Sequence, residues 1–231
     1  MSGSRLAALA WPDVPTGVLA VPVGSTEQHG PHLPVTTDTD IAEAIVDGLC
    51  QRRPDVVVAP AVSYGSSGEH AGFAGTLSIG RDAIELLLVE LGRSGADSFG
   101  RTLLVSTHGG NADPVNRAVT RLREEGRDVR AWAPRWEGDA HAGRVETSLM
   151  LAVAPDRVAL DRAAPGNTAP LAELLPDLST GGTRAVSENG VLGDPNGASA
   201  DEGRRLLDEA IDDLEALVID WMQVLTATPD R

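Results

Sequence analysis

Short apolar runs alternate with stretches of helical periodicity along the chain, and this alternation constrains the fold more than any other feature. Apolar residues at helical spacing follow each run, as Ile41, Ile45 and Leu49 do after the first. Strand-then-helix units in this order favour a mostly parallel sheet that helices cover on both faces. We therefore expect an α/β fold, and specifically a three-layer α/β/α sandwich. Strands are predicted at residues 18–23, 56–59, 102–106 and 129–133.

The rest of the chain completes this architecture without adding a second domain. Further helices are predicted at residues 84–91, from Pro114 onward, over residues 145–153, and from about Ala200 to Leu225. Residues 163–195 are rich in Gly and Pro, which predicts an ordered loop or flap. Because no internal repeat divides the sequence, residues 1–231 are expected to form one domain.

The charge balance excludes several classes of function. The chain has 34 acidic and 19 basic residues, and its net charge of −15 repels phosphate backbones. Nucleic acid is therefore not an expected partner. All 19 basic residues are arginine, which excludes a Schiff-base lysine and the lysine of a phosphate-binding loop. The classes of protein that remain are an acidic enzyme, a binding module and a structural protein.

The amino-acid content also indicates a compartment. Cys50 is the one cysteine, so no intramolecular disulfide can form, as is typical of proteins in a reducing cytoplasm. No run reaches the ~18 apolar residues that a membrane-spanning helix needs. Residues 1–11 lack the layout of a signal peptide. We expect a cytoplasmic protein with no membrane partner.

The positions of the five histidines give the first indication of chemistry. Each histidine lies in a segment that follows a predicted strand: His29 and His32 after the first, His70 after the second, His108 after the third, and His141 after the fourth. Loops at the carboxyl ends of parallel strands gather at one edge of the sheet, where ligands bind. A single loop histidine is more often structural, but five at one edge favour a shared site.

The densest cluster is Glu27-Gln28-His29, directly after the first predicted strand. Side chains two residues apart on an extended backbone point the same way, so Glu27 and His29 are expected to face one point. Asp38 can add a second carboxylate, although a helix N-cap is an equally good interpretation of this residue alone. Together these oxygen and nitrogen donors suit Zn²⁺, Mn²⁺ or Fe²⁺ better than Ca²⁺.

Two later clusters extend the hypothesis of a metal site. His108 precedes two glycines, which let the backbone pass close to a ligand, although an ordinary strand-to-helix turn also explains the glycines. His141 and Glu146 lie on either side of the predicted start of a helix. A buried Glu146 without a partner would be unfavourable, and a metal ion would supply that partner.

Several of these segments together resemble the creatininase family. The resemblance begins with VPVGSTEQHGPHLP at residues 21–34, followed by Thr37-Asp38. It continues with HAGFAGT at residues 70–76, HGGN at 108–111, HAG at 141–143 and ETS at 146–148, and it is fainter at residues 190–203. These motifs occur in the family's order and cover most of the chain as far as Pro155.

The resemblance implies an α/β/α domain, often assembled as a homo-oligomer, that hydrolyses amide-type C–N bonds. It also implies two divalent metal ions, for which Fe²⁺, Zn²⁺ and Mn²⁺ are the candidates. By the family's motifs, Glu27 and His29 would each hold one ion. Asp38 would bridge both ions, and His108 would bind the ion that Glu27 holds.

At one position the chain departs from the family pattern. Creatininase itself has a glutamate two residues after the histidine of its third strand, where this chain has Gly110. Creatinine hydrolysis is therefore not expected, and Glu146 is the candidate for the missing carboxylate ligand. His141 matches a family histidine that moves protons near the substrate. We expect both Glu146 and His141 to be catalytic, with His141 protonating the leaving amine.

Within the family, the chain most resembles actinobacterial peptidases. These act on a small ribosomal peptide whose C-terminal Val-Tyr pair a radical enzyme has crosslinked. The expected partners are thus this modified precursor peptide and further copies of the chain. The expected reaction is attack of metal-activated hydroxide on the amide carbonyl.

Residues around the expected metal site are candidates for substrate contact. Asn111, or a backbone amide of Gly109 or Gly110, is expected to steady the oxyanion of the tetrahedral intermediate. Tyr64, Ser66 and Phe73 are expected to contact the substrate, although loop packing explains these three equally well. Three other functions remain open: an amidohydrolase of cyclic amides or formamides, a non-catalytic binding module, and an acidic regulatory module.

Overall fold

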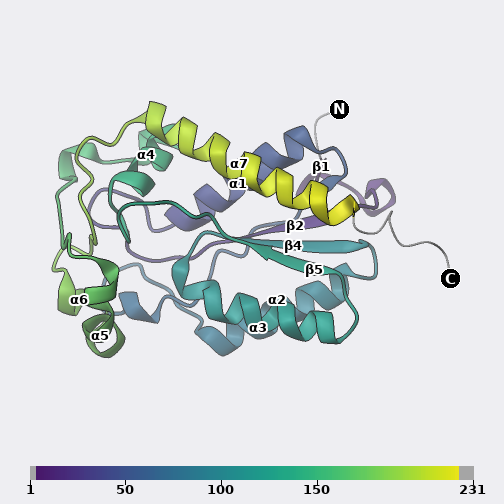
Figure 1. Ribbon diagram of the computed structural model, residues 1–231, viewed down its shortest axis with the longest axis horizontal. Coiled ribbons are helices and arrows are strands. Elements are labelled where there is room, and N and C mark those ends of the chain that lie inside the picture. The colour runs from purple at the N-terminus through teal and green to yellow at the C-terminus, as the bar shows by residue number, and fades with distance from the viewer. Residues whose placement is uncertain (1–3, 224–231) are drawn as a thin grey trace.

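The computed structural model describes residues 4–223, and the strands of this part of the chain form a five-stranded, all-parallel sheet. The strands are β1 (Ser4–Arg5), β2 (Val18–Val23), β3 (Val56–Val58), β4 (Arg101–Ser106) and β5 (Val129–Trp132). Their order across the sheet is β1-β3-β2-β4-β5. Helices cover both faces, so the predicted α/β sandwich is confirmed (Figure 1).

Each predicted strand is present, with ends within one residue of those expected. Side chains of β2 alternate between the faces: Val18 and Ala20 enter one core, and Leu19 and Val21 enter the other. Because both faces are buried, the strand has a continuous apolar sequence rather than an alternating one. β1 was not predicted, because two residues are too few to carry a pattern.

The helices form one layer on each face of the sheet. α1 (Thr37–Arg52), α4 (Arg144–Val153) and α7 (Ala200–Gln223) lie on one face, and α2 (Arg81–Gly95) and α3 (Ala112–Glu124) lie on the other. α7 approaches α4 closely at Gly203. A Cβ added there would lie 1.8 Å from the carbonyl oxygen of Ser148, so this crossing requires glycine.

Two helix starts differ from the prediction. α1 begins at Thr37, which makes Thr36 the N-cap residue and places Asp38 in the first turn, so Asp38 is not the cap. α3 begins at Ala112, two residues before the predicted Pro114, because proline is tolerated throughout a first turn whose N–H groups have no helical partner. Leu225, the last apolar position of the predicted C-terminal helix, lies outside the described residues.

Residues 163–195 contain two helices, which corrects the expectation of a loop throughout. These are α5 (Leu171–Gly181) and α6 (Thr183–Val186). Pro176 lies inside α5 and concealed it, because an internal proline normally ends a helical pattern. The segment then returns across the sheet edge, where Leu192 forms an isolated antiparallel bridge with His141. It therefore closes over the carboxyl ends of the strands.

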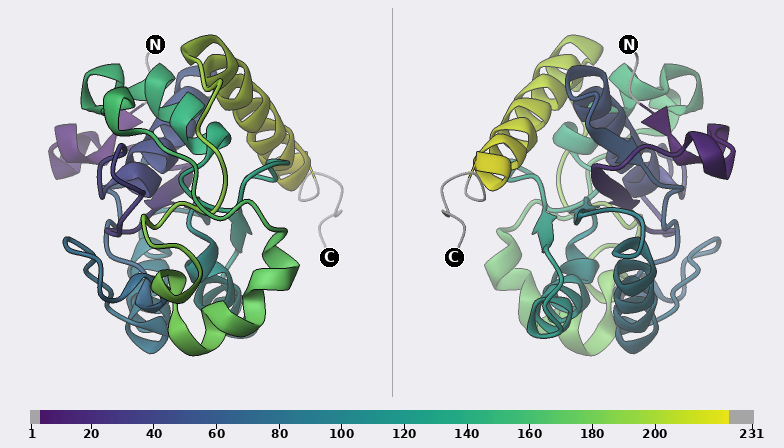
Figure 2. Two further views of the ribbon diagram at one scale, coloured as in Figure 1. Left: turned by 90° about the vertical axis from the view of Figure 1, so that its left-hand side faces the viewer. Right: turned by 90° about the vertical axis from the view of Figure 1, so that its right-hand side faces the viewer.

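The strand order changes direction between β2 and β4, at their carboxyl ends. The helices that follow these neighbouring strands, α1 and α3, cover opposite faces, so the chain diverges between them. Such a point is where open α/β sheets bind ligands. The left view of Figure 2 faces the loops at this edge. Within residues 4–223, no helix combines the length and hydropathy needed to cross a bilayer.

Candidate metal centre

Acidic and histidine side chains from four segments converge near the carboxyl ends of β2 and β4. In three groups of three, the possible ligand atoms lie within 4.8 Å of one another. These groups are Glu27, Asp38 and His108; His29, Asp38 and Glu146; and Glu27, His29 and His141. Asp38 belongs to the first two groups, so it lies between two possible metal positions. The structure thus brings together the residues predicted as ligands.

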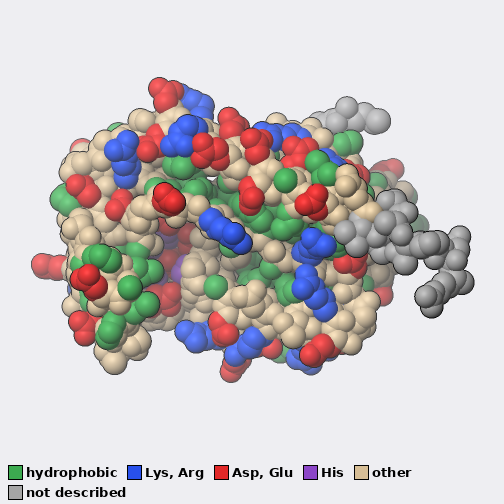
Figure 3. All heavy atoms as spheres, in the orientation of Figure 1, with side chains coloured by type: hydrophobic (Ala, Val, Ile, Leu, Met, Phe, Trp, Pro, Cys, Tyr) green, Lys and Arg blue, Asp and Glu red, His purple; other side chains and the backbone are tan. Residues whose placement is uncertain are grey.

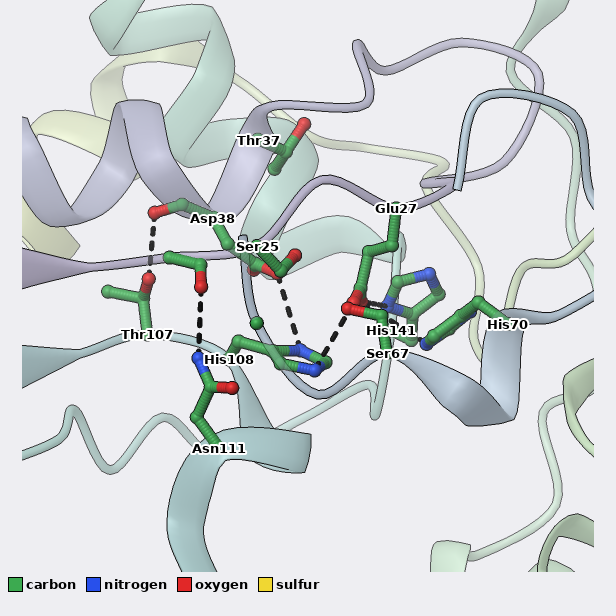
Figure 4. A network of polar contacts seen from close by, with 12 residues as sticks. Ser25, Glu27, Thr37, Asp38, Ser67, His70, Thr107, His108, Asn111 and His141 are labelled. Atoms are coloured by element: carbon green, nitrogen blue, oxygen red, sulfur yellow. Dashed lines mark hydrogen bonds and ion pairs between the residues drawn. The ribbon is translucent and has the colours of Figure 1, made fainter. Parts of the chain in front are cut away.

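Local structure explains how these side chains reach one point. Glu27 and His29 lie in the loop after β2, and His108 follows β4 directly before the short 3₁₀ helix Gly109–Asn111. Asp38 and Glu146 come from the first turns of α1 and α4. Glu27 and His29 have no exposed surface. Figure 4 shows the ring of His108 joined by dashed lines to the carboxylates of Glu27 and Asp38.

Backbone carbonyl oxygens fix the position of the proton on three of the histidines. A carbonyl oxygen only accepts hydrogen bonds, so a ring nitrogen beside one carries the proton. The other nitrogen of a neutral ring then has a free lone pair, which is the state that binds metal ions. The three pairs are His29 Nδ1 with Glu27 at 3.1 Å, His108 Nε2 with Ser66 at 2.9 Å, and His141 Nε2 with Gln28 at 2.8 Å.

All three free lone pairs face carboxylates, that of His141 Nδ1 at 4.0 Å from Glu27 Oε1. His29 Nε2 lies 3.4 Å from Asp38 Oδ1 and 3.9 Å from Glu146 Oε2, and His108 Nδ1 lies 3.4 Å from Asp38 Oδ2. Both carboxylate oxygens of Glu27 and Nε2 of His29 are buried without a hydrogen-bond partner among residues 4–223. Such atoms are rare in protein interiors. Lone pairs and carboxylates that face each other fit divalent cations bound between them.

The chain alone neutralises this charge by taking up protons. Burial disfavours the charged ring of His29, but Asp38 and Glu146 outweigh burial and raise the pKa of His29 to about 10. Glu27 and Asp38 likewise outweigh burial and raise the pKa of His108 to about 10. Burial raises the pKa of Glu146 to about 7, despite the opposing effect of His29.

Metal binding is therefore expected to release protons. With pKa values of about 10, His29 and His108 are protonated at pH 8 in the apoprotein and must lose these protons to bind a cation. We expect release of roughly two protons per chain and an apparent affinity that increases with pH up to about 10. Titration of apoprotein with Zn²⁺ in buffers of different ionisation enthalpy measures this number.

The same raised pKa values make the stability of the folded apoprotein depend on pH. The pKa values of both rings are raised above the ordinary 6.5, so their contribution to stability is complete below pH 6.5 and is lost as pH rises through about 10. Denaturant unfolding of apoprotein should show this decline. Metal binding without proton release would contradict the assignment of these two rings.

The backbone beside Glu146 is strained. Ala142 has a φ of 54°, the only positive φ of a non-glycine residue in the described part of the chain. Its N–H donates to Glu146 Oε2 at 2.5 Å, and this hydrogen bond aims the carboxylate at His29. Strain of this kind persists where surrounding contacts enforce it, and it clusters at functional sites.

Gly110 provides space for this cluster. A Cβ at this position would lie 2.2 Å from the carbonyl oxygen of Ser66, 2.4 Å from His108 Nε2 and 2.5 Å from Glu69 Oε1. The carboxylate of Glu69, delivered by a different loop, thus lies where a side chain at position 110 would begin. Glu69 Oε1 is 3.6 Å from His108 Nε2.

Sequence reasoning missed the site roles of Gln28, Glu69 and His70. His70 Nε2 lies 3.2 Å from Glu27 Oε1, and Gln28 Nε2 lies 2.8 Å from His70 Nδ1. The available signal for His70 was its position after a strand, which it shares with the other histidines. Glu69 has no such signal, because it lies in an irregular loop whose path depends on tertiary contacts.

The amide of Asn111, which was expected to steady an oxyanion, makes two hydrogen bonds to backbone. Its Oδ1 accepts from the N–H of Ser66 and its Nδ2 donates to the carbonyl oxygen of Gly24, both at 2.9 Å. Asn111 is fully buried, and its amide joins two loops. Ser66 is also buried, and it contributes its carbonyl oxygen to His108.

The other residues predicted to contact substrate lie nearer the surface. Tyr64 is 50% exposed. Phe73 is partly exposed, and the guanidinium of Arg184 lies over its ring, 5.2 Å from the centroid. This contact joins α6 to the loop after His70. Both aromatic residues remain candidates for substrate contact.

Fold and site together define a metal-dependent hydrolase of amide bonds. The family model for creatininase, described as creatinine amidohydrolase, matches residues 7–218. The chain belongs to the creatininase family.

Similar proteins fall into two groups. The mycofactocin precursor peptide peptidase of Mycolicibacterium smegmatis is 49% identical over 221 residues, which cover 93% of this chain and 87% of that protein. The peptidase of the same name from Mycobacterium tuberculosis is 48% identical over 215 residues, covering 88% and 85%. The creatinine amidohydrolase of Pseudomonas putida is 30% identical over 180 residues, covering 63% and 67%.

Solved structures show the same fold. A crystal structure of creatinine amidohydrolase matches with a TM-score of 0.79 at 24% identity, covering 94% of this chain and 97% of that one. A manganese form of creatininase gives a TM-score of 0.79 at 24% identity, covering 94% and 98%. The creatininase-like architecture predicted from the motifs is therefore confirmed.

Proposed function

We propose that this protein is a dinuclear metal-dependent peptidase. One observation carries the proposal: two groups of possible ligand atoms share Asp38, and histidine lone pairs face carboxylates within them. One divalent ion would be held by each group. When bound, such a pair of ions polarises the substrate carbonyl and lowers the pKa of water toward neutrality.

The substrate that we propose is the modified mycofactocin precursor peptide, from which the crosslinked C-terminal Val-Tyr dipeptide would be released. Support comes from relatives named for this substrate, which are 48–49% identical to this chain. The space-filling view is consistent with access for a peptide end. It shows a histidine with acidic side chains beside it in a hollow, in the half of the molecule that contains α5 and α6 (Figure 3).

His141 is the proposed proton carrier. Its Nε2 holds a proton against the carbonyl oxygen of Gln28, and its Nδ1 lies 4.0 Å from Glu27 Oε1. Burial, with His29 and His70 nearby, lowers the pKa of His141 well below 6.5, so the ring is neutral at pH 7. His141 therefore accepts a proton at Nδ1 from the attacking water before it can protonate the leaving amine.

Glu146 has two proposed roles. Its carboxylate would be a metal ligand in the group with His29 and Asp38. The second proposed role is catalytic; in the metal-free chain burial raises the pKa of this carboxyl to about 7, and a bound cation would lower this pKa. Glu146 would thus replace the carboxylate that the family pattern places at position 110.

The donor set suits Fe²⁺, Zn²⁺ or Mn²⁺, and we propose that the native ions are among these. We also propose a cytoplasmic homo-oligomer whose residues 1–231 form one domain. The free thiol of Cys50 is compatible with a reducing compartment.

A second candidate is hydrolysis of a small cyclic amide or a formamide. The likeness to the creatinine amidohydrolase of Pseudomonas putida favours it, because the same ligands would serve either reaction. Gly110 favours the peptidase over creatinine hydrolysis, because the glutamate of creatininase is absent there.

The two functions are separated by a substrate comparison. Metal-loaded protein is expected to release the C-terminal dipeptide from the crosslinked precursor, as measured by mass spectrometry. Strong chelation should abolish the release, and adding back one of the three ions should restore it. Full activity after complete metal removal would exclude the metal hydrolase. Hydrolysis of creatinine or formamides without cleavage of the peptide would establish the second candidate.

A further inference from the structure

His70 does not follow the pattern of the other site histidines. Its ring is buried and lies against that of His141, with the ring centroids 4.4 Å apart. Its Nε2 lies 3.2 Å from Glu27 Oε1, and its Nδ1 lies 2.8 Å from Gln28 Nε2. In Figure 4, His70 lies on the side of Glu27 away from Asp38.

Gln28 determines which nitrogen of His70 carries the proton. Gln28 Oε1 accepts from the N–H of Gly30 at 2.8 Å, which sets the orientation of the amide. One amide hydrogen is donated to the carbonyl oxygen of Gly190 at 3.0 Å. His141 Nε2 lies 3.0 Å from the amide nitrogen, but it cannot accept because it donates to the Gln28 carbonyl oxygen. The second amide hydrogen therefore goes to His70 Nδ1, and the proton of neutral His70 is on Nε2.

We propose that His70 is a positioning residue that donates from Nε2 to Glu27 Oε1 and thereby directs Oε2 toward a metal ion. The inference rests on the proposed metal centre, although it does not depend on the identity of the substrate. In the structure the N–H of His70 is not aligned with Oε1, so a small turn of the carboxylate completes the hydrogen bond. His70 thus presents a proton to Glu27 Oε1, whereas the N–H at Nε2 of His108, which lies 3.2 Å from Glu27 Oε2, is donated to the carbonyl oxygen of Ser66.

The positioning contacts extend into the segment that closes over the site. Thr183 of α6 places Oγ1 3.4 Å from His70 Nδ1, and Gly190 accepts from the amide that fixes the ring. Gly190 has a φ of 80°, and a Cβ there would lie 2.0 Å from Gln28 Oε1. A side chain at this position would therefore displace the amide without touching a metal ligand.

Two substitutions of His70 test the proposal on the full chain loaded with Zn²⁺. His70→Ala removes the donor and is expected to weaken binding of one of the two ions by roughly 10–100-fold, the usual effect of losing such an orienting partner. His70→Gln places an amide N–H near the position of Nε2 and is expected to bind within about threefold of wild type. Competition with a chromophoric chelator measures both affinities.

Gly190→Ala tests the same link from outside the metal centre. It is expected to reproduce the loss of His70→Ala. Gly126→Ala is the matched control, because Gly126 also has a φ of 80° but no atom within 4 Å of an added Cβ. Gly126→Ala should share the backbone strain and leave metal affinity unchanged. His32→Gln alters another buried histidine, whose Nε2 lies 2.9 Å from Thr147 Oγ1, and this variant should also leave metal affinity unchanged.

Each outcome decides the proposal. Equal affinities of His70→Ala and wild type would overturn it, and so would a His70→Gln variant that binds as weakly as His70→Ala. If His70→Ala does not fold, the metal affinity of Gly190→Ala compared with that of Gly126→Ala tests the proposal. A wild-type chain that binds no metal would instead overturn the proposed function, whereas loss of the proposed link alone would leave wild-type peptide cleavage intact.

Discussion

Replacement of Asp38 by asparagine is expected to remove at least one of two bound metal ions and to lower the hydrolysis rate by roughly 10³-fold or more. The two oxygens of Asp38 lie 3.4 Å from the free nitrogens of His29 and His108, so one carboxylate serves both possible metal positions. An amide nitrogen does not bind a cation there. Metal content of the purified variant and its rate under saturating Zn²⁺ measure the two effects.

Asp40→Asn is the matched control for this substitution. Asp40 lies in the same first turn of α1, but its Oδ2 is 2.8 Å from Arg157 Nη1 and outside the metal centre. This variant should retain both ions and nearly all activity. Two tightly bound ions in Asp38→Asn would show that the bridging assignment is wrong.

Gly110→Ala is expected to reduce metal affinity and catalytic rate by about 100-fold and stability by about 2–3 kcal/mol. The added Cβ would lie 2.2 Å from the carbonyl oxygen of Ser66 and 2.4 Å from His108 Nε2. The Ser66 carbonyl cannot retreat easily, because Asn111 holds the N–H of Ser66 at 2.9 Å. His108 must therefore turn away from its position beside Glu27.

The neighbouring glycine provides the control. A Cβ at Gly109 would meet no atom within 4 Å, so Gly109→Ala should bind metal and unfold as wild type does. Denaturant unfolding of the apoproteins separates the packing effect from the metal effect. A Gly110→Ala chain with wild-type metal affinity would mean that the position of His108 is not critical.

The sheet was predictable because its signal is local. Each buried strand is one short apolar run, and the helices between the strands keep an apolar stripe. Two elements were missed. β1 is too short to carry a pattern, and Pro176 is a helix-breaking signal inside α5. The sequence left Asp38 as either a metal ligand or a helix N-cap, and the start of α1 at Thr37 excludes the N-cap.

Candidate ligands were also recognisable before the structure, because parallel strands deliver the residues that follow them to one edge. That rule brought Glu27, His29 and His108 together. It could not show that the Asn111 amide is turned toward backbone, or that Glu69 occupies the space beside Gly110. These contacts depend on loop paths that no local pattern describes.

The sequence by itself determined the alternation of strands and helices, the acidic charge and the set of side chains available for chemistry. Only the tertiary structure decided the chemical state of those side chains. The proton on His141 is fixed by Gln28, 113 residues away, and the amide of Gln28 is held by Gly190, 162 residues away. Hydrophobic periodicity acts between neighbours along the chain, whereas protonation and free space at the site depend on atoms that only folding brings within contact.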